Sequence, residues 1–206
     1  SSGPQVGRHD DLVREEIAAS RAWVRALGRC GAIPPEDAQT LERGLGEVLA
    51  KAEKDPAYME VDLEDVHSFV EERLGEIVGD LAGQAHLGRS RNEQTVTALR
   101  LWARETIDRL RAATAALVVA LVAKGREGAD AVMPGYTHTR AAEPITFGHW
   151  AAAHAWGLVR DHERLRDARV RREPALVAIG GKPDQRVEMV VLEEMEQDVA
   201  VMQVLH

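Results

Sequence analysis

Apolar residues recur every three or four positions through most of the chain, which is the spacing of one face of an α-helix. Three such patterns, over residues 11–29, 34–56 and 63–78, occupy the first part of the sequence. Glycines follow the first pattern and a proline follows the second, and both are helix stop signals. We therefore predict three helices that form a small N-terminal helical subdomain, residues 1–88.

The longest pattern begins at Asn92 and continues to about Lys124, with apolar residues at spacings of three, four or seven. A helix of that length spans roughly 48 Å. It cannot bury its apolar stripe within a small subdomain, so it needs parallel neighbours from this chain or from copies of it. We predict that residues 89–206 form a central helical-bundle domain.

Two more helices are expected after this long one. The first covers roughly residues 144–171, with Pro144 in its first turn. The second covers residues 187–205. Before the first of these helices, residues 133–138 are expected to form a turn-rich loop. No segment alternates apolar and polar residues long enough to predict a strand. The predicted fold class is all-α, a long-helix bundle with a small N-terminal helical subdomain.

Composition narrows the class of protein. The chain has 206 residues, 45% of them hydrophobic, and a formal net charge of −8 at pH 7. This acidic balance argues against nonspecific binding to nucleic acid, although it is compatible with a local cationic pocket. Cys30 is the single cysteine, which excludes an intramolecular disulfide and a cysteine-rich metal site and fits a reducing compartment.

Targeting and cofactor motifs are not found in the sequence. No apolar run approaches the roughly 18 residues of a membrane span, and no signal peptide is recognisable. The sequence also has no Gly-rich nucleotide loop, HExxH motif or cysteine cluster. We expect a soluble, cytoplasmic protein with no metal, no organic cofactor and no membrane partner.

The segment HLGRSRNEQ, residues 86–94, is the first candidate site. Ser90 and Glu93 have the spacing of a capping box, in which the serine hydroxyl accepts from the Glu93 amide and the Glu93 carboxylate accepts from the Ser90 amide. The resulting helix N-terminus, beside Arg89 and Arg91, suits a carboxylate or a phosphate. The alternative is that the box only starts the helix and the arginines are solvated.

His138 lies in the second candidate segment, MPGYTHTRAAEP, which follows the long helix. Histidine exchanges protons near neutral pH, so His138 can serve as a general base or a relay, or it can be an ordinary loop histidine. His86 and His138 flank the long helix at roughly 45–50 Å. We expect their two segments to meet only if chains pack antiparallel in an oligomer. His67 is expected to be a packing or hydrogen-bonding histidine, because no second metal ligand follows at i+4.

Together these segments resemble the argininosuccinate lyase family of the fumarase/aspartase superfamily. The similarity rests on EDVHSFVEERL, HLGRSRNEQ, MPGYTHTRAAEPITFGHW and a charged RDxERLxDA helix, in this order over about residues 10–175. The resemblance implies an all-α homotetramer with a central helix bundle, whose active sites are assembled from three subunits.

The resemblance also implies a reaction, the β-elimination of argininosuccinate to arginine and fumarate in arginine biosynthesis. The substrate is thus a small dicarboxylate amino-acid derivative, which calls for preorganised hydrogen-bond donors. By the family's motifs, Ser90, Arg91 and Asn92 contact the substrate, Thr137 binds a carboxylate and His138 belongs to the acid–base relay.

The chain departs from the family pattern in several places. The GSSxMPxKxNP block, which carries the serine assigned to proton abstraction and a substrate-binding lysine, does not occur in these 206 residues, and neither does the family's C-terminal domain. Arg140 and Ala141 replace the usual glutamine and arginine after the histidine. The N-terminal substrate-binding serine and aspartate have no match near Gln5 and His9. We expect a fragment or a reduced relative.

Two alternative functions follow from these departures. One is a lyase that acts on another N-substituted succinate or aspartate. The other is a catalytically inactive structural or interaction homologue that lacks the serine loop.

Overall fold

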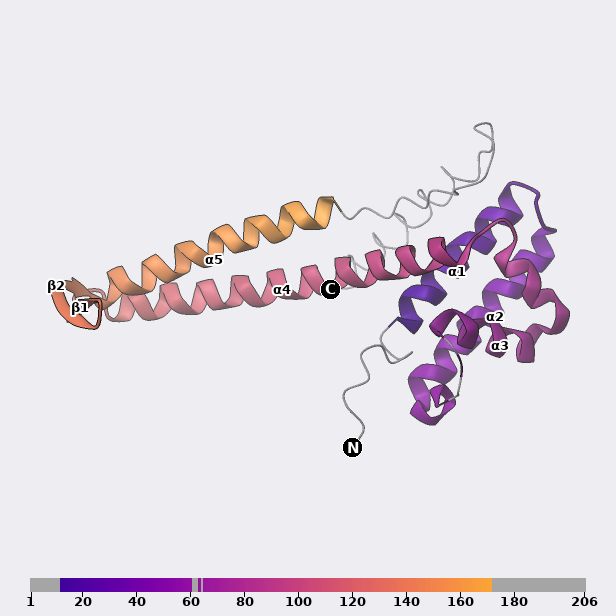
Figure 1. Cartoon of the computed structure of the whole chain (residues 1–206), viewed down its shortest axis with the longest axis horizontal. Helices are drawn as coiled ribbons and strands as arrows, with labels where there is room; N and C mark the ends of the chain where they lie inside the picture. Colours follow the sequence, from indigo (N-terminus) through magenta and orange to yellow (C-terminus); the bar gives the residue numbers. More distant parts are fainter. Residues whose placement is uncertain (1–11, 61–62, 64, 172–206) are drawn as a thin grey trace. The chain divides into compact units, whose positions relative to one another are not determined.

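The computed structural model describes residues 12–60, 63 and 65–171 (Figure 1). These residues belong to two compact units divided between Trp102 and Ala103. These residues are predominantly helical, with a single two-stranded sheet among them. The predicted all-α class is therefore confirmed. The predicted domain boundary at residues 88/89 stays a prediction.

The first unit contains the three helices predicted from the hydrophobic spacing, each within a few residues of the expected bounds. Short 3-10 helices, η2 and η3, follow the second and third of them. The elements are α1 (Val13–Arg29), α2 (Pro35–Lys54), η2 (Pro56–Met59), α3 (Val66–Val78) and η3 (Gly79–His86).

Aliphatic side chains, Phe69 and Trp23 fill the core of this unit. The side chains that are essentially inaccessible to solvent come from all three helices and include Ile17, Leu41, Leu45, Phe69 and Leu74. A glycine permits the close approach of α2 and α3, because a Cβ atom at Gly44 would lie 2.8 Å from Leu74 Cδ1.

Helix α4 (Arg91–Glu127) confirms the predicted long helix and extends it by a few residues at its C-terminal end. Its 37 residues correspond to a length of about 55 Å. The first turns belong to the first unit, where Gln94, Thr97 and Ala98 are buried. The remainder, from Ala103 onward, belongs to the second unit.

The second unit combines the later turns of α4 with strands β1 (Val132–Thr137) and β2 (Arg140–Thr146) and with helix α5 (Phe147–Val170). Within this unit α5 runs antiparallel to α4 along its length (Figure 1). Small residues allow the contact, because a Cβ atom at Gly125 would lie 3.1 Å from that of Ala151. Farther along, Arg169 Nε donates to Asp108 Oδ2 at 2.8 Å.

The predicted loop at residues 133–138 and the predicted helix start at Pro144 are both wrong. These residues form an antiparallel hairpin in which Pro134 pairs with Pro144, and α5 begins only at Phe147. Both strands are edges of a two-stranded sheet, and edge strands tolerate proline because its nitrogen need not donate to a neighbour. An irregularity between Pro134 and Tyr136 further breaks the alternation that would have indicated a strand.

None of the helices in the described part of the chain combines the length and the apolar character needed to cross a membrane. The predicted helix at residues 187–205 lies outside the described residues.

Candidate functional site

The predicted capping box is present at the start of α4. The Ser90 amide donates to Glu93 Oε2 at 2.6 Å, and the Glu93 amide donates to Ser90 Oγ at 3.4 Å. Ser90, Arg91 and Asn92 are all exposed. Because Arg91 and Asn92 open the helix, their amides have no intrahelical carbonyl to bind. This turn therefore offers backbone donors, a hydroxyl, an amide and a guanidinium to an anion.

The side chain of Arg89 does not add a cation to this turn as predicted, and it is not solvated either. Its side chain is 1% exposed, donates from Nη2 to Ser20 Oγ at 2.7 Å and lies 3.4 Å from Glu16 Oε1. The guanidinium also lies 5.9 Å from the ring centroid of Trp23, whose Nε1 donates to the Leu87 carbonyl at 3.1 Å. The segment that leads into α4 is thus tied to α1 on its inner side.

Arg91 is the arginine that stays accessible. Its Nε lies 3.7 Å from Asp65 Oδ2 and its Nη2 lies 3.7 Å from Glu71 Oε2. Asp65 also caps α3 by accepting from the Ser68 amide at 2.7 Å. Burial raises the pKa of Asp65, but the bonds from Ser68 and the charge of Arg91 lower it overall. An ionised Asp65 therefore helps hold Arg91 beside Ser90 without burying its charge.

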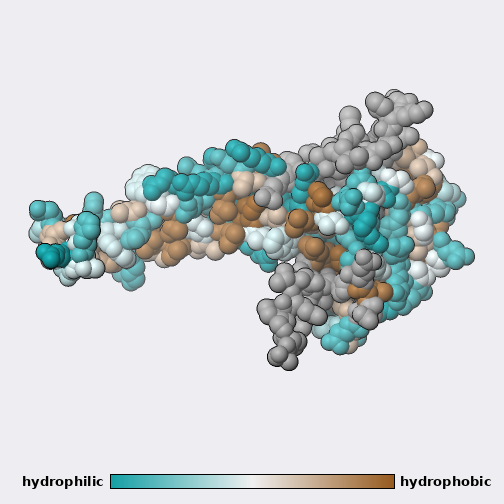
Figure 2. Space-filling model, in the orientation of Figure 1, coloured by the Kyte–Doolittle hydropathy of each residue, from teal (hydrophilic) through white to brown (hydrophobic). Residues whose placement is uncertain are grey.

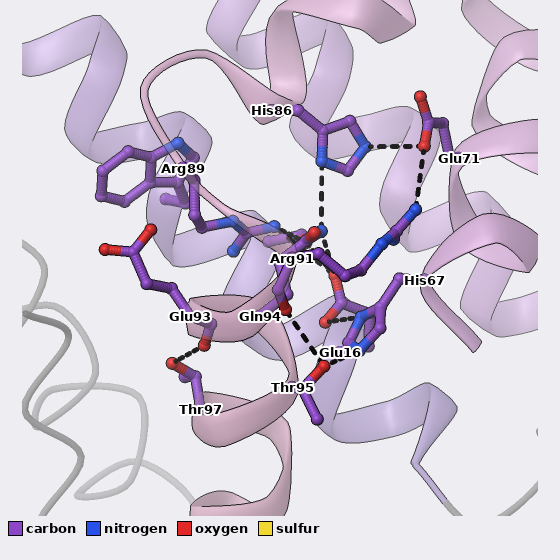
Figure 3. Close-up of polar contacts among 12 residues, drawn as sticks. Glu16, His67, Glu71, His86, Arg89, Arg91, Glu93, Gln94, Thr95 and Thr97 are labelled. Carbon is purple, nitrogen blue, oxygen red and sulfur yellow. Dashed lines mark hydrogen bonds and ion pairs between the residues drawn. The ribbon is translucent and has the colours of Figure 1, made fainter. Parts of the chain in front are cut away.

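His67 confirms the expectation of a packed, hydrogen-bonded histidine. It is 3% exposed, with Nδ1 at 2.7 Å from Glu16 Oε2 and Nε2 at 3.1 Å from Thr95 Oγ1 (Figure 3). Glu16 is a site residue that the sequence analysis does not predict, although the sequence carries a signal for it. Glu16, Ser20, Trp23 and Leu27 recur at spacings of four, three and four, which places Glu16 on the buried face of α1.

Thr137 and His138 lie where β1 ends and the hairpin turns. His138 has φ of 49° and Thr139 has φ of 63°, both in the left-handed region. Positive φ at two consecutive residues is the geometry of a type I′ hairpin turn, which asparagine and glycine favour. A β-branched threonine in this conformation is strained. Thr137, His138 and Arg140 are exposed. The strained turn therefore holds polar side chains at the surface.

The five predicted site residues thus form two groups, one in each unit. Ser90, Arg91 and Asn92 open α4, and Thr137 and His138 follow it after the first strand of the hairpin. Within residues 12–60, 63 and 65–171, no group of three His, Cys, Asp or Glu side chains is arranged to hold a metal ion.

Solved structures with a similar fold include EDDS lyase and fumarate lyases. EDDS lyase in complex with formate superposes with a TM-score of 0.76 at 25% sequence identity, covering 90% of this chain and 37% of that one. A fumarate lyase:delta crystallin from Brucella melitensis superposes with a TM-score of 0.77 at 20% identity, covering 97% of this chain and 49% of the other. The second likeness shows the fold alone.

The chain belongs to the family described as "Lyase", whose model matches residues 5–197. Argininosuccinate lyase from Roseiflexus sp. (strain RS-1) is 47% identical over 155 residues, and that from Roseiflexus castenholzii is 44% identical over 154 residues. The predicted resemblance to argininosuccinate lyases is confirmed. The alignments cover 75% of this chain and 34% of each relative, so the chain spans about a third of their length.

Proposed function

We propose that this chain provides a carboxylate-binding segment and a proton-transfer segment of a carbon–nitrogen lyase that converts argininosuccinate to arginine and fumarate in arginine biosynthesis. The observation that carries the proposal is the exposed Ser90-Arg91-Asn92 turn at a capped helix start, in a chain 44–47% identical to argininosuccinate lyases.

The chemistry of the turn fits this substrate. A proton leaves the carbon beside a carboxylate, its electron pair forms the carbon–carbon double bond, and the carbon–nitrogen pair passes to nitrogen, which takes up a proton. Negative charge develops on the carboxylate during the first step. In our proposal Ser90, Arg91 and Asn92 donate hydrogen bonds to a substrate carboxylate, and donors already held in place stabilise such charge most effectively.

The hairpin supplies the second group of residues. In our proposal Thr137 binds the other carboxylate and His138 relays the proton. The left-handed conformations of His138 and Thr139 support this role, since strained backbone of this kind clusters at functional sites.

We further propose that copies of the chain assemble as a homotetramer, with the helix opening of one copy beside the hairpin of another. Large apolar side chains on α4 and α5 support this assembly, because monomers rarely expose contiguous apolar patches. Figure 2 shows hydrophobic residues along this helical pair. They include Leu110, Leu117, Val119 and Trp156, which are 50%, 49%, 69% and 64% exposed.

The cytoplasmic location remains a prediction.

One observation favours a second candidate. The likeness to EDDS lyase, at 25% identity and a TM-score of 0.76, supports a lyase of the same reaction class with a substrate other than argininosuccinate.

The test is an assay of the intact protein, including any sequence that follows His206 in its reading frame, with argininosuccinate as substrate. Ultraviolet absorbance is expected to report fumarate, in amounts equal to the arginine released. Asn92→Ala is expected to lower the rate of fumarate release at least about tenfold. This factor corresponds to the free energy of one lost hydrogen bond to a charged group. Gln39→Ala, which removes an exposed amide from α2, serves as the matched control.

Two results contradict the proposal. One is binding of argininosuccinate without fumarate release, which favours the second candidate or an inactive homologue. The other is equal activity of Asn92→Ala and the parent, which removes this turn from the site.

A further inference from the structure

Glu16 on α1 is fully buried, and its carboxylate contacts side chains from three other segments (Figure 3). Oε1 accepts from Ser20 Oγ at 2.7 Å and from Gln94 Nε2 at 3.2 Å, and it lies 3.4 Å from Arg89 Nη2. Oε2 lies 2.7 Å from His67 Nδ1. Burial raises the pKa of Glu16, but His67, Arg89 and Ser20 outweigh it and lower the pKa overall. The carboxylate is therefore ionised at neutral pH.

The hydrogens of Gln94 are fixed by its two neighbours. Gln94 Nε2 lies 3.2 Å from Glu16 Oε1 and 3.1 Å from His86 Nδ1. A carboxylate only accepts, so the NH₂ group faces Glu16, and its second hydrogen goes to His86 Nδ1. His86 then accepts at Nδ1 and is neutral. This agrees with the pKa of His86, which burial lowers overall although the charge of Glu71 raises it.

His67 connects Glu16 to the first turns of α4. Thr95 Oγ1 has one hydrogen and donates it to the Arg91 carbonyl at 3.0 Å. The same Oγ1 lies 3.1 Å from His67 Nε2, within hydrogen-bond distance. His67 Nδ1 faces Oε2 of the ionised Glu16 at 2.7 Å. His67 thus links the Glu16 carboxylate on α1 to Thr95 on α4 through its two ring nitrogens.

These links converge on one short segment. Arg89 immediately precedes Ser90, Gln94 lies in the first turns of α4, and Thr95 holds the Arg91 carbonyl. One carboxylate on α1 thus fixes residues 89–95 from both sides of the exposed turn. Without its charge, the buried guanidinium of Arg89 loses its counter-charge, which is strongly unfavourable, and the segment must rearrange to solvate it.

We propose that Glu16 is a positioning residue that holds the Ser90-Arg91-Asn92 turn in the geometry that binds a substrate carboxylate, acting through Arg89, Gln94 and the His67–Thr95 pair. This inference rests on the proposed function of the turn. Binding groups have to stay within about 0.5 Å of the productive geometry. Glu16 itself does not touch the substrate.

The experiment compares fumarate binding by the intact parent protein and three variants, using calorimetry. Glu16→Gln keeps the shape and removes the charge, and Glu16→Asp keeps the charge. Val48→Ala is the matched control, since it opens a cavity in the same core from α2. Glu16→Gln is expected to weaken fumarate binding at least about tenfold, and Glu16→Asp to restore it to within about threefold of the parent.

A purely structural role is separated by a second readout. Val48→Ala is expected to lower the melting temperature and leave fumarate affinity at the parental value. Hydrogen exchange is expected to speed up at the amides of Glu93 and Gln94 in Glu16→Gln and to remain parental there in Val48→Ala. Parental affinity in Glu16→Gln overturns the proposal. Equal loss of affinity in Glu16→Gln and Val48→Ala overturns it too.

Thr95→Val covers the case in which Glu16→Gln does not fold. Thr95 is exposed, and valine preserves its shape while it removes the hydroxyl between His67 and the Arg91 carbonyl. Fumarate binding is expected to weaken several-fold, and parental affinity overturns the proposal.

The two proposals fail differently. A parent that binds fumarate but releases none from argininosuccinate contradicts the proposed reaction and leaves the Glu16 comparison intact. A parent that binds no fumarate overturns both.

Discussion

Glu93→Ala is expected to destabilise the protein more than Ser90→Ala, although both belong to one capping box. The Glu93 carboxylate is largely buried and accepts from the Ser90 amide at 2.6 Å. A hydrogen bond to a charged group contributes about 1.5–3 kcal/mol. The reciprocal bond, from the Glu93 amide to Ser90 Oγ, is 3.4 Å long. Loss of a serine cap costs about 0.5–2 kcal/mol, and so long a bond belongs at the lower end.

The two changes should therefore differ by about 1–2 kcal/mol in the free energy of unfolding. Urea denaturation followed by circular dichroism, at one protein concentration for all variants, measures the difference. Glu105→Ala is the control, since Glu105 is exposed on the same helix and has no part in the cap. It should change the free energy of unfolding by no more than about 0.5 kcal/mol. A Ser90→Ala cost equal to or above that of Glu93→Ala would refute the reasoning.

Three further predictions concern the hairpin and pH. His138→Asn is expected to lower kcat far more than it raises KM for argininosuccinate in the intact protein, and equal turnover in mutant and parent removes His138 from the mechanism. Burial lowers the pKa of His86 below its ordinary 6.5, against the charge of Glu71, so the folded state binds its proton less readily than the unfolded chain. Stability should hold above pH 6.5 and fall as pH drops from 6.5 through the lower folded pKa, and denaturation of His86→Asn across this window should show a smaller fall. Gly135→Ala would set a Cβ atom 2.7 Å from a backbone oxygen of β2 and should cost about 1–3 kcal/mol. Gly46→Ala, in open space on α2, should stabilise by about 0.5–1 kcal/mol in the same denaturation assay, and the opposite order contradicts the hairpin packing.

The features that could be predicted from the sequence depend on residues close together in the chain. The capping box needs only Ser90 and Glu93, three positions apart, so its pattern predicts its geometry. The helices follow from apolar spacing in the same way. The hairpin does not follow from the local sequence, because Pro134 and Pro144 favour no strand by themselves and their pairing joins residues ten positions apart. The strained turn at His138 likewise departs from the residues that turns of this type favour.

The sequence by itself therefore determined the helical class, the family and the segments that carry the candidate chemistry. Only the tertiary structure decided which arginine of the first segment can meet a ligand. Arg89 and Arg91 look alike in the sequence, but Arg89 is buried against Glu16, 73 residues earlier, while Arg91 stays exposed. The physical reason is that burying a guanidinium requires a buried counter-charge, and only the packing of α1 against the start of α4 provides one.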